Sequence, residues 1–143
     1  VSNDDDNNIL IDTTSILDNL PTKINDIDIN IHRTLTIYSW GIKKDHDHME
    51  CDLIFDLTKF QTKISKDIDI KTITGLSDTI QNSIIHHPLF LEIIEYVVKK
   101  IETTNPTHIA FICNHGKHRS VAWVELLKTL YYNKSIIKHL QMI

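Results

Sequence analysis

Eight consecutive residues late in the chain combine side chains that bind anions. The segment 113–120 reads CNHGKHRS and follows an apolar run, HIAFIC. Lys117 and Arg119 carry positive charge, and the planar fork of the arginine can hold two phosphate oxygens at once. Gly116 lets the backbone approach a ligand without a Cβ in the way. The segment therefore predicts an anion site suited to phosphate.

The other polar side chains of this segment add hydrogen-bonding groups. Asn114 and Ser120 supply neutral donors, and His115 and His118 can be neutral or cationic at about pH 6.5, so binding could depend on pH. The predicted ligand-binding residues of the segment are Cys113, Asn114, His115, Gly116, Lys117, His118, Arg119 and Ser120. The alternative is an ordinary turn whose cation and hydroxyl only cap the following helix. So many polar donors in one turn favour binding.

The same residues resemble the phosphate loop of cysteine-dependent phosphatases, through the pattern C-x-x-G-x-x-R-S. That resemblance implies Cys113 as nucleophile, Arg119 as the group that binds the equatorial oxygens, and Ser120 as an aid to thiolate departure. Ile112 stands where that family has a histidine, and no aspartate is identified as the leaving-group acid. A buried, inert thiol is the other interpretation of Cys113. We expect binding rather than catalysis, with a cysteine-dependent phosphatase as the alternative.

A strand before the segment and a helix after it must hold it in place. Short apolar runs bounded by polar or turn residues predict strands in RTLTIYSWG, CDLIFDL, HIAFIC and SIIKHL. Helical spacing predicts helices from Thr74 to His87, over 89–106 and over 117–132. Strands separated by helices of about 12 or more residues indicate crossover connections. We therefore expect an α/β fold, a single compact domain with a mainly parallel sheet covered by helices.

Parallel sheets bind ligands at the carboxyl ends of their strands. This rule selects the turns around Gly41, Asp56 and Gly116. A carboxylate beside an anion loop would repel phosphate, so we expect Asp56 to orient Arg119 or to accept a hydroxyl of the ligand.

Several landmarks in fixed order resemble one known family. They are SWGIK at 39–43, CDLIFD at 51–56, TGL at 74–76, GKHRSV at 116–121, and a histidine, His139, on the last strand. From about residue 34 to the end, the chain is similar to the C-terminal domain of the RNase adapter family RapZ. GKHRSV is the most specific of these segments, and only this family accounts for the others.

The resemblance implies an α/β domain that binds a phosphorylated sugar, takes part in binding small RNAs, contacts a ribonuclease and self-associates to a homo-oligomer. It adds supporting residues to the predicted binding site: Ser39, Gly41, Lys43, Thr74, Gly75 and His139. The nucleotide motif G-x-x-x-x-G-K-[ST] of the family's other domain is absent from this sequence. Thr58 and Leu140 stand where the family has arginines, so we expect weaker RNA binding than in other members.

Composition limits the remaining function classes. Lys and Arg total 15 against 19 for Asp and Glu, a net charge of -4, so no global basic field recruits nucleic acid or a membrane. The two cysteines and the absence of a signal-peptide pattern favour a cytoplasmic location, and no apolar stretch reaches the length of a membrane span. We expect a low-complexity, partly disordered leader at 1–30, the phosphate-binding domain at 31–143, and no cofactor.

Some other side chains invite a functional interpretation that we set aside. The charged loop DHDHMEC contains His46, His48, Glu50 and Cys51. Its spacing matches no usual zinc pattern, so we expect no metal and a solvated loop that can close over the pocket. His86 and His87 are expected to cap a helix end before Pro88. The aromatic side chains expected in the core are Tyr38, Trp40, Phe55 and Trp123.

Overall fold

One parallel sheet with helices against it forms the protein. The computed structural model describes residues 8–11, 28–43, 49–62, 64 and 67–141. The strands are β1 (Asn8–Leu10), β2 (Thr36–Gly41), β3 (Leu53–Asp56), β4 (His108–Cys113) and β5 (Ile136–His139). The helices are α1 (Asp78–Ile85), α2 (Phe90–Thr104), α3 (Arg119–Leu130) and a short 3-10 helix, η3 (Ile70–Thr72). The strand order is β1-β3-β4-β2-β5, and every pairing is parallel, which confirms the predicted α/β class.

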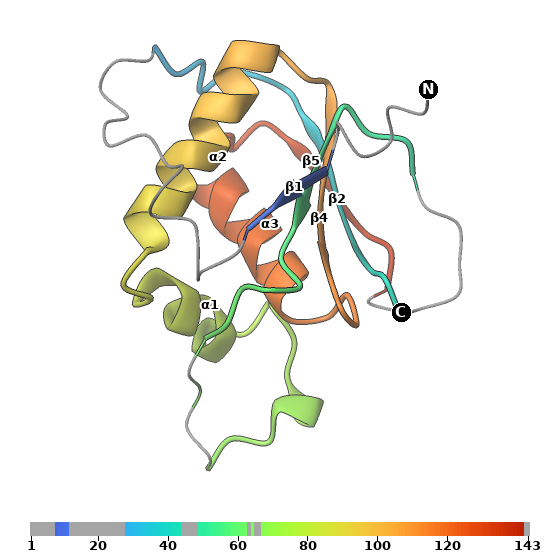
Figure 1. Ribbon diagram of the computed structural model, residues 1–143, viewed down its shortest axis with the longest axis vertical. Helices are drawn as coiled ribbons and strands as arrows, with labels where there is room; N and C mark the ends of the chain where they lie inside the picture. The colour runs from blue at the N-terminus through green and yellow to red at the C-terminus, as the bar shows by residue number, and fades with distance from the viewer. Residues whose placement is uncertain (1–7, 12–27, 44–48, 63, 65–66, 142–143) are drawn as a thin grey trace.

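The three α-helices cover the same face of the sheet (Figure 1). Ile37, Ile109 and Phe111 point to this face, because alternate side chains of a strand lie on opposite sides. Helix α2 places a stripe from Phe90 to Ile101 against them, as its spacing predicts. Trp123 of α3 is fully buried between the layers, stacked 6.3 Å from Phe111. Burial of these apolar surfaces stabilises the fold.

The opposite face of the sheet carries a second, smaller apolar cluster. Its buried members are Tyr38, Trp40, Cys51, Ala110 and Ile112. The expectation that the aromatic side chains belong to the core is therefore met on both faces. Burial, with the negative charge of Asp52 adding to it, raises the pKa of Cys51 to about 12, so this thiol stays protonated at neutral pH.

The structure differs from the predictions around α1 and at the N-terminal end of the described chain. The helix expected from Thr74 begins at Asp78, because Ser77 is its N-cap and accepts a hydrogen bond from the Thr79 amide. It ends at Ile85, where the His86 amide donates to the Asn82 carbonyl and the His87 amide donates to the Ile84 carbonyl. At the N-terminal end, β1 pairs with β3, and Ile11 is fully buried. Residues 8–10 therefore belong to the sheet and lie within the segment 1–30 that was expected to be a leader.

A hydrogen-bonded ion pair joins the elements near the start of β2. Arg33 donates to both carboxylate oxygens of Glu102, at 3.1 Å from Nε and 2.9 Å from Nη2. The Tyr132 hydroxyl and the Asn30 amide donate to the same carboxylate, at 2.6 and 3.1 Å. The Glu102 side chain is 5% exposed, so these four hydrogen bonds replace the water that its charge has lost.

Candidate anion-binding site

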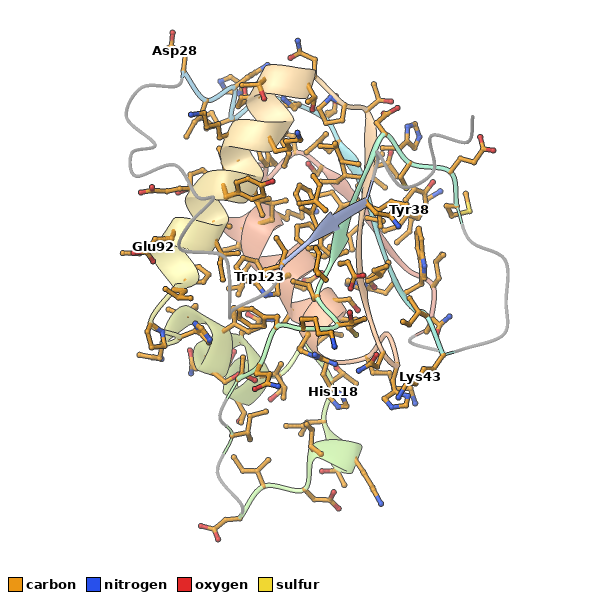
Figure 2. All side chains as sticks on the ribbon, viewed as in Figure 1. Asp28, Tyr38, Lys43, Glu92, His118 and Trp123 are labelled. Carbon is orange, nitrogen blue, oxygen red and sulfur yellow. The ribbon has the colours of Figure 1, made fainter. Side chains whose placement is uncertain are left out.

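The loop between β4 and α3, residues 114–118, lies at the carboxyl edge of the sheet. Gly41 and Cys113 end their strands side by side, so the chain leaves both at one place. Beyond the strands, the Ile42 and Lys43 amides donate to the Cys113 and Asn114 carbonyls, at 2.9 and 3.0 Å. Lys43 and His118 lie at the same end of the molecule in Figure 2. The strand-to-helix placement expected for this segment is thus present.

All three glycines of the chain lie at this loop. Gly116 has a φ of +76°, a conformation that side chains with a Cβ rarely adopt. A Cβ on Gly41 would come within 2.3 Å of the His115 carbonyl carbon. Gly75 donates its amide to the Lys117 carbonyl at 2.7 Å, and its α-carbon faces the first turn of α3. The absence of side chains allows two separate backbone segments, at Gly41 and Gly75, to pack on the loop that contains Gly116.

Cys113 points into the core. It is 2% exposed and belongs to the apolar cluster under the helices. Its sulfur accepts a hydrogen bond from the Gly116 amide at 3.2 Å, and its thiol donates to the Ser120 hydroxyl at 3.2 Å. A buried thiol used in this way braces the loop from beneath, while a nucleophile needs access to its substrate.

Two side chains of the loop hold the long connection between β3 and α1. Arg119 Nη1 donates to the carbonyls of Leu57 and Phe60, at 3.0 and 2.8 Å, and also approaches the Thr58 carbonyl at 3.3 Å. His118 Nε2 lies 2.8 Å from the carbonyls of Ile70 and Ile73. Carbonyls only accept hydrogen bonds, so this nitrogen carries the ring proton. The guanidinium is therefore fixed by backbone carbonyls and not by an internal carboxylate.

A surface pocket of about 780 Å³ lies between this loop and the connection. Its basic or imidazole lining side chains are Lys71, His115, His118 and Arg119. Its apolar lining residues are Phe60, Ile64, Ile68, Ile70 and Ile80, and Gln61 and Thr62 also line it. Helix α3 starts beside the pocket, and no side chain caps the backbone N–H groups of its first turn. This arrangement can attract and hold an anion.

The side chains of Ser39, His139 and Glu125 form a separate hydrogen-bonded series. The Ser39 hydroxyl and His139 Nδ1 are 2.6 Å apart, and His139 Nε2 is 2.9 Å from a Glu125 carboxylate oxygen. The two residues are register partners on β2 and β5. Ser39 is fully buried. These hydrogen bonds therefore link the last strand to α3, and none of the three residues lines the pocket.

The remaining predicted site residues contribute backbone or local contacts. Lys43 reaches the loop through its amide, and its side chain is exposed. Thr74 accepts a hydrogen bond from the Leu76 amide through its hydroxyl, which shapes the turn before α1. Asp56 was expected to orient Arg119 or to accept a ligand hydroxyl. Its carboxylate instead accepts a hydrogen bond from the Thr58 amide at 2.8 Å, since a carboxylate two residues before an amide closes a local turn.

Several residues of the site have no counterpart in the sequence motifs. The apolar lining residues Phe60, Ile64, Ile68 and Ile70 belong to no single motif. Glu125 could have been noticed, because a carboxylate within the apolar helix sequence VAWVELL needs a partner. Lys71 could not, since only the fold brings η3 to the loop.

A comparison with protein families decides the relationship. The family described as the RapZ C-terminal domain matches residues 33–142. The chain belongs to the RapZ C-terminal domain family. Membership confirms the resemblance seen in the sequence and makes this a domain of regulatory, RNA-adaptor type. A search of curated proteins gave no match.

Residues 44–48, which include His46 and His48 of the charged loop, lie outside the described residues. Among the residues that are described, no three His, Cys, Asp or Glu side chains gather as a possible metal site. In the same part of the chain, no helix has the length and apolar character that a membrane crossing requires. His86 caps the end of α1 as expected, with Nδ1 2.8 Å from the Asn82 carbonyl.

Proposed function

We propose that this RapZ-type domain binds a phosphorylated small molecule and acts as a sensor, with the phosphate held by the segment 113–120. The observation that carries the proposal is the pocket beside this segment, whose lining includes Arg119, Lys71 and two imidazoles. An uncapped helix start adds backbone donors in the same place. Anion binding therefore needs no basic field over the whole protein, which has a net charge of -4.

The resemblance to the family supports a more detailed form of the same proposal. It implies a sugar phosphate as the ligand, together with RNA, a ribonuclease and a second copy of the chain as partners. The positions of Thr58 and Leu140, where the family has arginines, support a weaker RNA contribution here. We therefore place ligand recognition first and the RNA-adaptor role second.

Calorimetric titration with inorganic phosphate and an amino sugar phosphate tests the binding function. We expect Arg119→Ala to weaken binding about tenfold or more, because a charged hydrogen bond contributes about 1.5–3 kcal/mol. Arg119 also holds the Leu57 and Phe60 carbonyls, so thermal unfolding of the variant is followed in parallel. Lys117→Gln is a second variant within the segment 113–120, since this residue contributes to the fold through its backbone carbonyl, which accepts from the Gly75 amide. It should weaken binding without changing stability.

Lys128→Gln is the matched control for charge. This lysine lies outside the segment 113–120, on α3 nine residues after Arg119 and about 13 Å further along the axis. The Lys128→Gln variant should bind phosphate with the same affinity as the unchanged protein. If neither phosphate nor the sugar phosphate binds, or if all three variants bind alike, the proposed function is wrong.

The phosphatase alternative has one supporting observation, the hydrogen bonds of the Cys113 sulfur to Gly116 and Ser120. Burial of this thiol in the core favours a structural role. We expect no turnover of an aryl phosphate above the rate of the Cys113→Ser variant. A clear rate that disappears in this variant would establish the enzyme instead.

A further inference from the structure

The short helix η3 brings a cation to the pocket from outside the segment 113–120. Lys71 is the middle residue of η3 and lines the pocket together with His118 and Arg119. We propose that Lys71 contacts the phosphate of the bound ligand. His118, which the sequence predicted as a ligand contact, is then a positioning residue that holds Lys71 in place through η3. This assignment rests on the proposed function and adds a cation to the phosphate site.

The charge of Lys71 is available to a ligand. Its side chain is exposed, and among the described residues no carboxylate forms an ion pair with its ammonium group. Asp69 is two residues away, and its carboxylate accepts a hydrogen bond from the Lys71 amide at 3.0 Å as the N-cap of η3. The described lining of the pocket includes Arg119 and no carboxylate. Two cations that line one pocket repel one another, whereas a phosphate dianion attracts both.

His118 fixes η3 beside the anion segment (Figure 2). None of the three residues of η3 is buried, so burial of its own side chains does not hold it. His118 Nε2 lies 2.8 Å from the Ile70 carbonyl and 2.8 Å from the Ile73 carbonyl. These two carbonyls flank Lys71 in the chain. Ile73 also packs against the core, which holds the end of the turn, so the bond to Ile70 is the contact that orients its start.

The hydrogen bonds of His118 leave its neutral ring without a donor for an anion. The single Nε2 proton is shared between two carbonyls, and Nδ1 of a neutral imidazole carries no proton. A positioning role needs only a donor at the place of Nε2. Glutamine can supply one through its side-chain amide, whereas leucine cannot. A role in ligand contact would require the charge of the imidazolium, which neither substitution keeps.

Calorimetric titration with inorganic phosphate and with an amino sugar phosphate tests the assignment. We expect Lys71→Gln to weaken the binding of both about threefold to tenfold, because it removes one charged hydrogen bond from an exposed site. His118→Leu should weaken binding by the same factor, and His118→Gln should bind within about twofold of the unchanged protein. The double variant Lys71→Gln, His118→Leu should bind as Lys71→Gln alone does, because His118 acts through Lys71.

Lys134→Gln is the matched control for the loss of a lysine. Lys134 is exposed and precedes β5, so it lies at the amino edge of the parallel sheet, opposite the candidate site. The Lys134→Gln variant should bind both compounds as the unchanged protein does. Circular dichroism checks that each variant folds. If His118→Leu does not fold, the expected difference between Lys71→Gln and His118→Gln still tests the assignment.

The possible results separate this assignment from the function on which it rests. If the compounds bind and Lys71→Gln behaves like Lys134→Gln, the assignment is overturned and the proposed function stands. A loss confined to the sugar phosphate would place Lys71 on the sugar and has the same consequence. The positioning role is overturned if His118→Gln binds as weakly as His118→Leu, or if the losses of Lys71→Gln and His118→Leu multiply in the double variant. Failure of both compounds to bind the unchanged protein overturns the assignment and the proposed function together.

Discussion

Replacement of Gly75 by alanine is expected to lower the free energy of unfolding by about 3 kcal/mol, the upper end of the usual cost of overpacking. A Cβ at this position would lie 2.3 Å from the Ala122 amide nitrogen and 2.4 Å from the His118 carbonyl oxygen. Both atoms belong to backbone in the first turn of α3, which cannot rotate away as a side chain could. The segment before α1 must therefore move off the helix. Chemical denaturation followed by circular dichroism measures the change.

Leu76→Ala is the control for the Gly75 variant. Leu76 is the next residue and is 52% exposed, so its truncation should change stability by no more than about 0.5 kcal/mol. Equal stability of the Gly75→Ala variant and the unchanged protein would contradict the close contact between the TGL turn and α3. The contact is also expected to matter for binding, because the Gly75 amide holds the Lys117 carbonyl.

Replacement of Glu102 by glutamine should cost about 2–4 kcal/mol of stability, since it leaves Arg33 without its charged partner in a partly buried site. The Arg33 side chain is 16% exposed and the Glu102 side chain is 5% exposed. Burial by itself would raise the pKa of Glu102. The hydrogen bonds from Arg33, Tyr132 and Asn30 outweigh it and hold the pKa below its ordinary value of 4.5. The charged form is thus the one that stabilises the fold.

The sign of the pH dependence follows from that lowered pKa. The unfolded chain binds a proton on Glu102 more readily than the folded chain does, so the contribution of this residue is complete above about pH 4.5 and is lost as the pH falls below it. The stability difference between the unchanged protein and Glu102→Gln should shrink over this range. Glu95→Gln, a partly exposed carboxylate on the same helix, serves as the control. A difference that stays constant with pH would contradict the proposed role of the carboxylate.

Local patterns predicted the fold and the main segment of the candidate site. The apolar runs around Phe55 and Phe111 marked buried parallel strands, and the spacing from Phe90 to Ile101 marked α2, because each pattern repeats with the geometry of its own element. The segment 113–120 was recognised from residue types alone. Its placement after β4 followed from the rule that strand ends form binding edges.

Contacts between distant segments were beyond the sequence. Nothing local shows that Arg119 reaches carbonyls near Phe60, or that Glu125 meets His139. The start of α1 was predicted too early, since Thr74 and Ser77 are both good caps and the choice between them depends on how Gly75 packs on α3. The apolar lining of the pocket was missed for the same reason. The isoleucines of the β3–α1 connection follow no helix or strand pattern in the sequence, and only the fold brings Ile64, Ile68 and Ile70 to one pocket.

The gathering of every glycine at one loop has a practical consequence for genetic dissection of this protein. Any substitution at Gly41, Gly75 or Gly116 adds atoms where main chain already fills the space. Loss of binding in such a mutant would result from a displaced backbone and would say little about which residues contact the ligand. Informative alleles must instead come from positions whose side chains face solvent at the rim, such as His115 or Lys71.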